Sequence, residues 1–163
     1  MHPEPELRPA THEDLPALVG LIRELAEYEK LTHLVVLDEG MLARELFDKD
    51  SRAEALVCLA GGAAVGMALY FHNFSTFLGR KGLYLEDLYV QPAHRGKGYG
   101  KALLLALARI AHERGCGRLE WMVLDWNEPS IRFYESLGAV RMEDWRLFRV
   151  TGEALEKLAR MQP

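Results

Sequence analysis

The chain has 163 residues, of which 49% are hydrophobic and 27% charged, and its formal net charge is -4. These values predict one globular domain over residues 1–163, and they disfavour a nucleic-acid-binding protein while leaving room for a cationic substrate. No apolar run is long enough to cross a bilayer and residues 1–10 do not resemble a signal peptide, so we expect a cytoplasmic protein with no membrane partner.

The first half of the chain predicts two helices and several strands. Thr11 and Asp14 have the spacing of a capping box, which begins a helix that ends near Glu29. Asp38 can cap a second helix, and the pair 61–62, two glycines, predicts a hairpin. The elements expected here are a strand at 7–10, helices at 11–29 and 38–47, and strands at 55–59, 64–71 and 82–90.

The second half predicts a helix that is apolar almost all round, at 102–112, and therefore packed against a sheet. Pro129 is tolerated in the first turn of a later helix, and Gly138 ends that helix. Helices that cover a sheet in this order indicate a mixed α/β (α+β) domain. The further elements expected are a strand at 118–124, a helix at 127–137, strands at 139–142 and 145–150, and a helix at 152–161.

The run 95–100, Arg-Gly-Lys-Gly-Tyr-Gly, lies between an expected strand and an expected helix. Glycines at alternate positions let the backbone turn sharply and point successive N–H groups inward, where the helix N-terminus adds further donors. The run is therefore typical of a phosphate-binding loop. A glycine-rich connection without a ligand is the alternative.

Acidic residues interrupt two otherwise regular elements. Glu86 and Asp87 stand in an apolar strand, and a side-chain period of two would place them on opposite faces, with only one facing a substrate. Tyr28 and Glu29 end an acidic helix, where they form either a solvated surface or a rim that binds an ammonium group. A solvated rim strand explains Glu86 and Asp87 equally well.

The cysteines and histidines carry weaker signals. Cys58 and Cys116 have no spacing typical of a disulfide or a metal site, so both are expected to be free thiols. A catalytic Cys116 is the less favoured alternative, since no histidine is implicated by its spacing. For His72, His94 and His112 we expect surface or packing roles.

Several segments together resemble the GNAT acetyltransferases. Residues 95–100 match their acetyl-CoA loop, Q/R-x-x-G-x-G/A, and the segments 83–88, 126–131 and 133–134 are similar to the diamine branch with the spermidine/spermine and thialysine acetyltransferases. The resemblance covers nearly the whole chain. It implies a V-splayed mixed sheet of about seven strands flanked by helices, with acetyl-CoA as cosubstrate and no metal.

The resemblance also implies direct acetyl transfer to the primary amine of a small polyamine or lysine-like substrate, and a homodimer. A non-catalytic acyl-CoA sensor and a protein or peptide N-acetyltransferase are the alternatives. Tyr134 corresponds to the general acid and Glu86 to an acceptor-site carboxylate. The residues that correspond to the cofactor site are Leu88, Tyr89, Val90, Arg95, Gly96, Lys97, Gly98, Tyr99, Gly100, Lys101, Asn127, Glu128, Pro129 and Ser130. Those that correspond to the substrate site are Tyr28, Glu29, Glu86, Asp87, Glu120, Trp121 and Met122.

Overall fold

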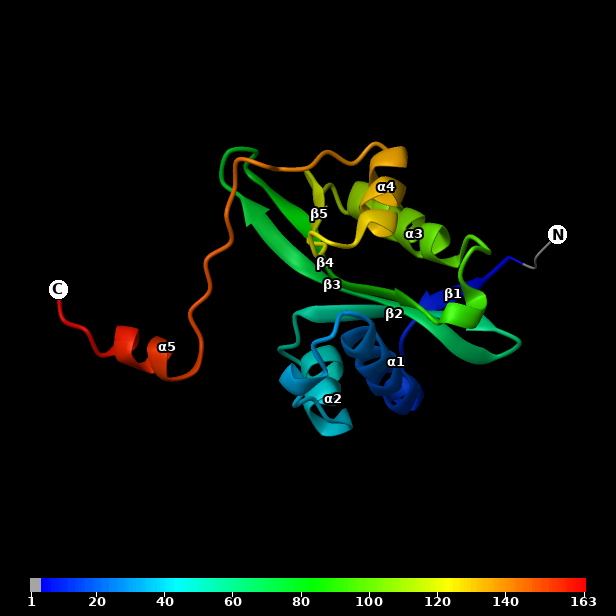
Figure 1. Ribbon diagram of the computed structural model, residues 1–163, viewed down its shortest axis with the longest axis horizontal. Helices are drawn as coiled ribbons and strands as arrows, with labels where there is room; N and C mark the ends of the chain where they lie inside the picture. Colours follow the sequence, from blue (N-terminus) through cyan, green and yellow to red (C-terminus); the bar gives the residue numbers. More distant parts are fainter. Residues whose placement is uncertain (1–3) are drawn as a thin grey trace. The chain divides into compact units, whose positions relative to one another are not determined.

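The computed structural model describes residues 4–163, which form two compact units that meet in sequence between Leu124 and Asp125. The larger unit is built on one five-stranded sheet with strand order β1-β2-β3-β4-β5 (Figure 1). Neighbouring strands are antiparallel except for the parallel pair β4 and β5. The strands are β1 Glu6–Pro9, β2 Ala53–Ala60, β3 Ala63–Ser75, β4 Arg80–Val90 and β5 Leu119–Trp121.

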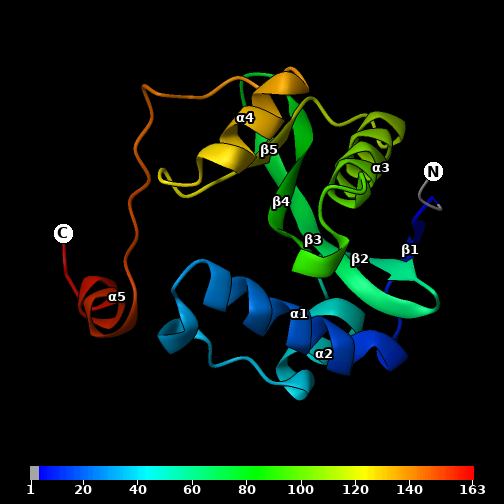
Figure 2. The same ribbon diagram turned by 45° about the vertical axis from the view of Figure 1, so that its right-hand side comes forward.

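Helices cover both faces of this sheet. α1 (Leu15–Tyr28) and α2 (Glu39–Phe47) lie on one face, and α3 (Tyr99–Glu113) lies on the other (Figure 1, Figure 2). The leucines on one side of α1 and α2 pack against alternate residues of the strands, among them Val57, Met67 and Tyr89. None of the helices in the described part of the chain has the length and apolar character that a membrane span requires.

The smaller unit contains α4 (Glu128–Ser136) and α5 (Gly152–Ala159) and has no strand among its residues 125–163. The expectation of about seven strands is therefore wrong for the described chain, which has five, although the mixed α/β class is confirmed. The expected strands at 139–142 and 145–150 do not form. An apolar sequence becomes a strand only where a neighbouring strand supplies ladder hydrogen bonds, and these residues have none in the described structure.

The local signals for helix starts and turns are confirmed. Asp38 caps α2, since its Oδ1 accepts a hydrogen bond from the Met41 N–H at 2.7 Å. Gly61 and Gly62 form the turn between β2 and β3 with φ of +58° and +81°, a conformation that glycine adopts at little cost. β3 and β4 are longer than expected. The polar residues His72, Asn73 and Ser75 interrupt the apolar pattern from which the strand ends were predicted, so the outer part of this hairpin was missed.

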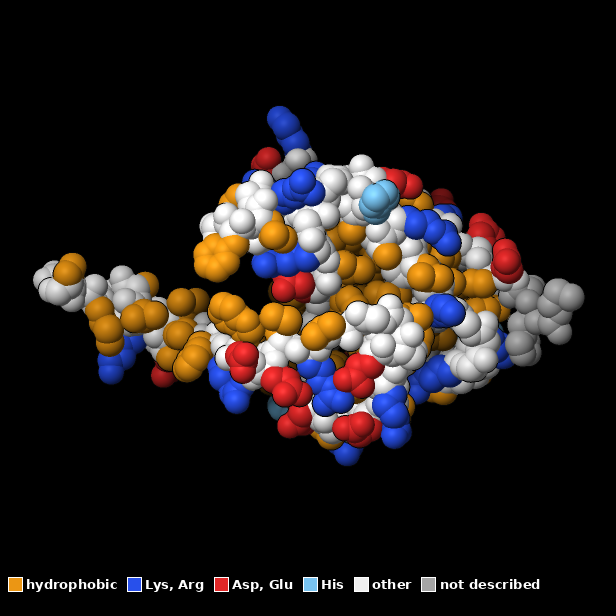
Figure 3. Space-filling model, turned by 90° about the horizontal axis from the view of Figure 1, so that it is seen from above, with side chains coloured by type: hydrophobic (Ala, Val, Ile, Leu, Met, Phe, Trp, Pro, Cys, Tyr) orange, Lys and Arg blue, Asp and Glu red, His pale blue; other side chains and the backbone are white. Residues whose placement is uncertain are grey.

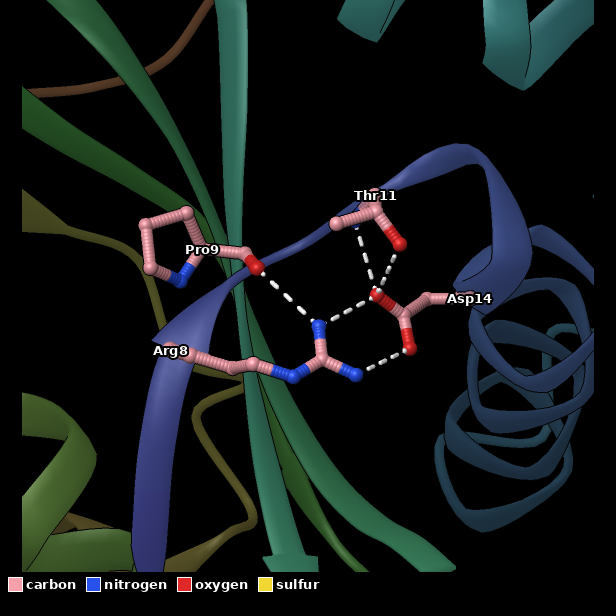
Figure 4. A network of polar contacts seen from close by, with 4 residues as sticks. All are labelled: Arg8, Pro9, Thr11 and Asp14. Atoms are coloured by element: carbon pink, nitrogen blue, oxygen red, sulfur yellow. Dashed lines mark hydrogen bonds and ion pairs between the residues drawn. The ribbon is translucent and has the colours of Figure 1, made fainter.

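A polar network joins β1 to the start of α1 (Figure 4). Asp14 accepts hydrogen bonds from two Arg8 nitrogens at 2.6 and 2.9 Å and from the Thr11 N–H at 2.7 Å. These donors favour the charged carboxylate and lower the pKa of Asp14 to about 2. The capping box expected at Thr11 is thus completed by an ion pair.

We expect Asp14→Asn to lower the free energy of unfolding by about 1 to 2 kcal/mol at pH 7, since the charged hydrogen bonds to Arg8 are lost. The pKa of Asp14 is about 2 in the folded chain against 3.8 ordinarily, so its contribution is complete above pH 3.8 and is lost as the pH falls toward 2. Urea unfolding at pH 7 and pH 3 measures this. An equal destabilisation at pH 7 by Asp50→Asn, at an exposed position, would contradict it.

Candidate active site

The glycine-rich loop leads directly into α3. Gly96 and Gly98 have φ of +73° and +84°, which directs the chain through two left-handed turns before the helix begins at Tyr99. Within the described chain, no backbone N–H from Gly96 to Lys101 donates to a protein acceptor, whereas the Ala102 N–H already bonds to the Gly98 carbonyl at 2.9 Å. The loop therefore offers a series of donors at the positive end of a helix, which suits a diphosphate.

The neighbouring strand β4 has an open edge. Its pairing with β5 is limited to three residues, from Leu83–Leu119 to Leu85–Trp121. From Glu86 to Val90 that edge of β4 has no strand partner among the described residues. Backbone groups of Leu88 to Val90 can therefore pair with an extended ligand that ends at the diphosphate loop.

A β-bulge lies in β4 where its two acidic residues stand. Leu85 pairs with Tyr70 of β3 and Asp87 pairs with Leu69, so Glu86 is an extra residue without a partner. The bulge interrupts the strict alternation of side chains on which the expectation of opposite faces rested, and Glu86 is exposed whereas Asp87 is partly buried. The sequence gives no sign of this register shift.

Two contacts fix the C-terminal end of α1 beside β4. The Gln91 side-chain amide donates to Glu24 at 3.0 Å. The Arg95 guanidinium lies over the Tyr28 ring, 4.8 Å from its centroid, and over the Tyr89 ring at 5.4 Å, while its Nε donates to the Val90 carbonyl at 2.9 Å. Arg95 thus connects the loop to the helix, and its own N–H is already bonded to Pro92.

This arrangement gathers three carboxyl groups at one place. Burial, together with the smaller effect of the charges of Glu86 and Glu29, raises the pKa of Asp87 to about 6. Burial also raises the pKa of Glu29. Carboxylates that repel one another in a partly desolvated site bind a cation favourably and accept a proton near neutral pH.

The residues expected on β5 have different surroundings. Glu120 pairs in register with Tyr84 of β4, forms an ion pair with Arg118 at 2.7 Å, and accepts a hydrogen bond from Asn73 at 3.1 Å. Trp121 is half-buried and Met122 is exposed. Sequence reasoning missed Asn73, since only the pairing of β3 with β4 and of β4 with β5 brings it to Glu120.

The remaining expected site residues belong to the smaller unit. Asn127 is buried at the N-cap position of α4, and Pro129 lies in the first turn as expected. Tyr134 is half-buried, and its ring lies 5.4 Å from that of Phe133 in a tilted arrangement. Glu128 and Ser130 occupy the same first turn. Their roles stay predictions.

Cys116 has a histidine neighbour that the spacing did not indicate. Its Sγ lies 3.8 Å from His72 Nδ1, but that nitrogen also lies 3.0 Å from the Gly82 carbonyl, which can only accept. Nδ1 therefore carries the proton, and the ring cannot take one from the thiol through this contact. Burial raises the pKa of the other cysteine, Cys58, to about 11. Neither thiol is activated as a nucleophile by these contacts.

Comparison with known proteins agrees with this geometry. The chain is 38% identical over 164 residues to a thialysine N-epsilon-acetyltransferase of Bos taurus, covering 94% of this chain and 96% of the relative. It is 32% identical over 200 residues to an L-ornithine N5-acetyltransferase of Arabidopsis thaliana, covering 95% and 88%. Both relatives are named for acetylating an amine.

A solved structure shares the fold of this chain, and a family model identifies its family. An integron cassette protein from the mobile metagenome of V. cholerae superposes with a TM-score of 0.81 at 29% identity, covering 96% of this chain and 98% of that one. Residues 18–139 match the model of the acetyltransferase (GNAT) family. On these grounds the chain belongs to the GNAT family and is an amine N-acetyltransferase.

Proposed function

We propose that this enzyme transfers the acetyl group of acetyl-CoA directly to the primary amine of a small lysine-like molecule or polyamine. The observation that carries the proposal is the carboxyl cluster of Glu29, Glu86 and Asp87, in the same unit as the diphosphate loop. The relatives named for thialysine and ornithine support an acceptor with a terminal alkyl amine.

The residues present fit coenzyme A. Free N–H groups from Gly96 to Lys101 suit its diphosphate, and the open edge of β4 at Leu88 to Val90 suits the amides of its pantetheine arm. In the second unit, Asn127 to Ser130 would line the cofactor further. Because the family match at 18–139 crosses the boundary between Leu124 and Asp125, we propose that both units belong to one catalytic domain.

The carboxyl groups bind the ammonium group of the substrate and remove its proton. An alkyl ammonium has a pKa of about 10.4, so it arrives charged and must lose a proton before it can attack. Asp87 and Glu29 bind the cation, and Glu86 accepts its proton directly or through water. Acetyl-CoA supplies the thioester carbonyl, to which the nitrogen bonds as the carbon–sulfur bond breaks. Tyr134 donates its phenolic proton to the departing sulfur.

Coenzyme A release with a panel of amines tests the proposed function. We expect rapid release of free thiol from acetyl-CoA with diamines or basic amino acids, and slow release without an amine. Binding of coenzyme A with no amine-dependent release would indicate a sensor. Release only with a peptide would indicate a protein or peptide N-acetyltransferase.

Substitution of Gly98 should change only the affinity for coenzyme A. Gly98 has φ of +84°, and no atom lies within 4 Å of the position that a Cβ would occupy, so a valine strains the backbone without a steric clash. We expect Gly98→Val to weaken coenzyme A binding in calorimetry by about tenfold or more, as the N–H groups lose their common direction. Gly79→Val, at φ of +62° in the β3–β4 turn, is the matched control. Equal affinity in both variants would contradict the loop assignment.

We propose that the protein is a homodimer that acts in the cytoplasm. Hydrophobic side chains follow the C-terminal segment in the space-filling view (Figure 3), and the exposed fractions of Val140 and Phe148 are 82% and 91%. Exposed apolar side chains in such number favour burial against another surface, here a second copy. The free thiols of Cys58 and Cys116 fit a reducing compartment. Sedimentation of the purified chain as a monomer would contradict the dimer.

A further inference from the structure

Arg95 is the first residue of the glycine-rich loop, yet its side chain lies against the end of α1. Its guanidinium carbon is 4.8 Å from the centroid of the Tyr28 ring, at the last residue of α1, and 5.4 Å from that of Tyr89 on β4. Its backbone N–H donates to the Pro92 carbonyl at 3.2 Å. The free donors of the loop therefore begin at Gly96, and the mechanism above gives the Arg95 side chain no part.

Several contacts define the position of this side chain. A guanidinium is attracted to the negative face of an aromatic ring, and here two rings lie beside it. Arg95 Nε also donates to the Val90 carbonyl at 2.9 Å. Burial and the charge of Glu24 raise the pKa of Tyr89, whereas Arg95 lowers it, so these three groups lie close together. The Arg95 side chain thus connects α1 to β4.

The two rings belong to residues that neighbour the carboxyl groups of the site. Glu29 directly follows Tyr28 in the chain. Asp87 lies two residues before Tyr89 on β4, and both pair regularly with β3, so their side chains share a face. The charge of Glu29 contributes to the raised pKa of Asp87, which indicates that the two carboxyl groups are near each other. Arg95 therefore contacts both elements that carry them.

The end of α1 has a defined backbone, but its distance from β4 depends on contacts outside the helix. Lys30 has φ of +62°, and its N–H donates to the Glu27 carbonyl at 3.1 Å, which ends the helix. These local features set the direction of the chain at Glu29 and not its distance from the sheet. The hydrogen bond to Glu24 lies one turn earlier. Arg95 acts on the residue next to Glu29.

We propose that Arg95 is a positioning residue of the acceptor site, which holds the last turn of α1 against β4 so that Glu29 and Asp87 bind one ammonium group. The guanidinium itself contacts neither the acceptor nor the reacting atoms. Without it the two carboxylates move apart, and each attracts the cation less because the Coulomb energy falls with distance. A side chain of the cofactor loop thereby sets the affinity for the amine. This inference rests on the proposed function.

The affinities for the two substrates test this assignment. With lysine or cadaverine as acceptor and saturating acetyl-CoA, Arg95→Gln should raise KM for the amine by about tenfold. Calorimetry should show that its dissociation constant for coenzyme A changes by less than about twofold. Lys97→Gln is the matched control, since it removes the same charge from the loop and Lys97 has no polar contact with α1 in the described structure. It should weaken coenzyme A binding and leave the KM for the amine unchanged.

Variants of the contact partner show whether Arg95 acts through α1. Tyr28→Phe keeps the ring, so Arg95→Gln should still raise the KM for the amine about tenfold in this background. Tyr28→Leu removes the ring, and Arg95→Gln should add at most about threefold there. Arg95→Lys keeps a cation near the rings but loses the Nε bond to Val90, so its KM should lie between those of wild type and Arg95→Gln. Because Arg95 is exposed, we expect these variants to fold.

Two results would overturn this inference while leaving amine acetylation intact. One is a folded Arg95→Gln variant that keeps the wild-type KM for the amine but binds coenzyme A about tenfold more weakly, which would assign the guanidinium to the diphosphate. The other is an equal effect of Arg95→Gln in the Tyr28→Phe and Tyr28→Leu backgrounds. Failure of the wild type to acetylate any amine would overturn the proposed function as well.

Discussion

Replacing Tyr134 with phenylalanine is expected to lower kcat by about 100-fold or more while coenzyme A affinity stays the same. A thiolate that leaves without protonation is a poorer leaving group, and a positioned acid contributes about 10²- to 10⁴-fold to such a step. The phenol lies in α4 next to Phe133, so the variant keeps the ring and its packing. Steady-state kinetics at saturating amine and calorimetry with coenzyme A separate the two quantities.

Tyr70→Phe is the control for loss of a phenol elsewhere. Tyr70 is buried in β3, where burial and the charge of Glu54 raise its pKa to about 12. Its replacement should change the free energy of unfolding but not kcat. If Tyr134→Phe retained the wild-type kcat across the whole pH range, Tyr134 would not be the acid.

The sequence predicted those parts of the fold that depend on residues close together in the chain. The caps at Thr11 and Asp38 and the turn at Gly61 are local, because each requires only a few residues of backbone and one side chain. The glycine loop belongs to the same class, since Gly96 and Gly98 need a left-handed φ whatever surrounds them. The caps and the turn were therefore predicted correctly, as were the sharp turns of the glycine loop, whose binding of a phosphate stays a prediction.

The arrangement of the acidic residues could not be predicted in this way. The bulge at Glu86 is a property of two strands, and its register is fixed by the pairing of Leu69 with Asp87. The nearness of Glu29 depends on α1, which Gln91 and Arg95 hold in place. Contacts between residues so distant in the chain leave no period or spacing to detect.

The second half of the chain shows the limit of apolar patterns. The sequence predicted strands at 139–142 and 145–150 from hydrophobic residues such as Val140 and Phe148, but both side chains are exposed. An apolar pattern indicates which side chains favour burial, but it does not indicate which surface they pack against. For the same reason Asn73 was not singled out, since its contact with Glu120 depends on the pairing of β3, β4 and β5.

Asp87→Asn is expected to have two large effects of opposite direction, one on activity and one on stability. Loss of the negative charge should lower kcat/KM for amines by about 100-fold, because the ammonium loses a buried counter-ion. Glu86→Gln should lower kcat because it removes the proton acceptor, and the acidic limb of the remaining activity should lie below its wild-type position near pH 6, because a charge that raises the pKa of Asp87 is lost. Profiles of kcat/KM against pH measure both. An unchanged acidic limb in Glu86→Gln would contradict the electrostatic coupling of the two residues.

Asp87→Asn should also make the folded chain more stable at neutral pH. The pKa of Asp87 is about 6 in the folded chain against an ordinary value of 3.8, so folding becomes less favourable as the pH rises between these values. Above pH 6 the penalty is complete, on the order of 1 to 3 kcal/mol, and asparagine removes it. The gain in Tm over wild type should therefore be largest near pH 8 and should disappear toward pH 4, whereas Asp50→Asn, at an exposed site, should show neither. A variant less stable than wild type at pH 8 would mean that a partner in the folded chain already neutralises the charge of Asp87. A carboxylate that is already neutralised would not bind the ammonium group of a substrate, so this result would also contradict the proposed cation site.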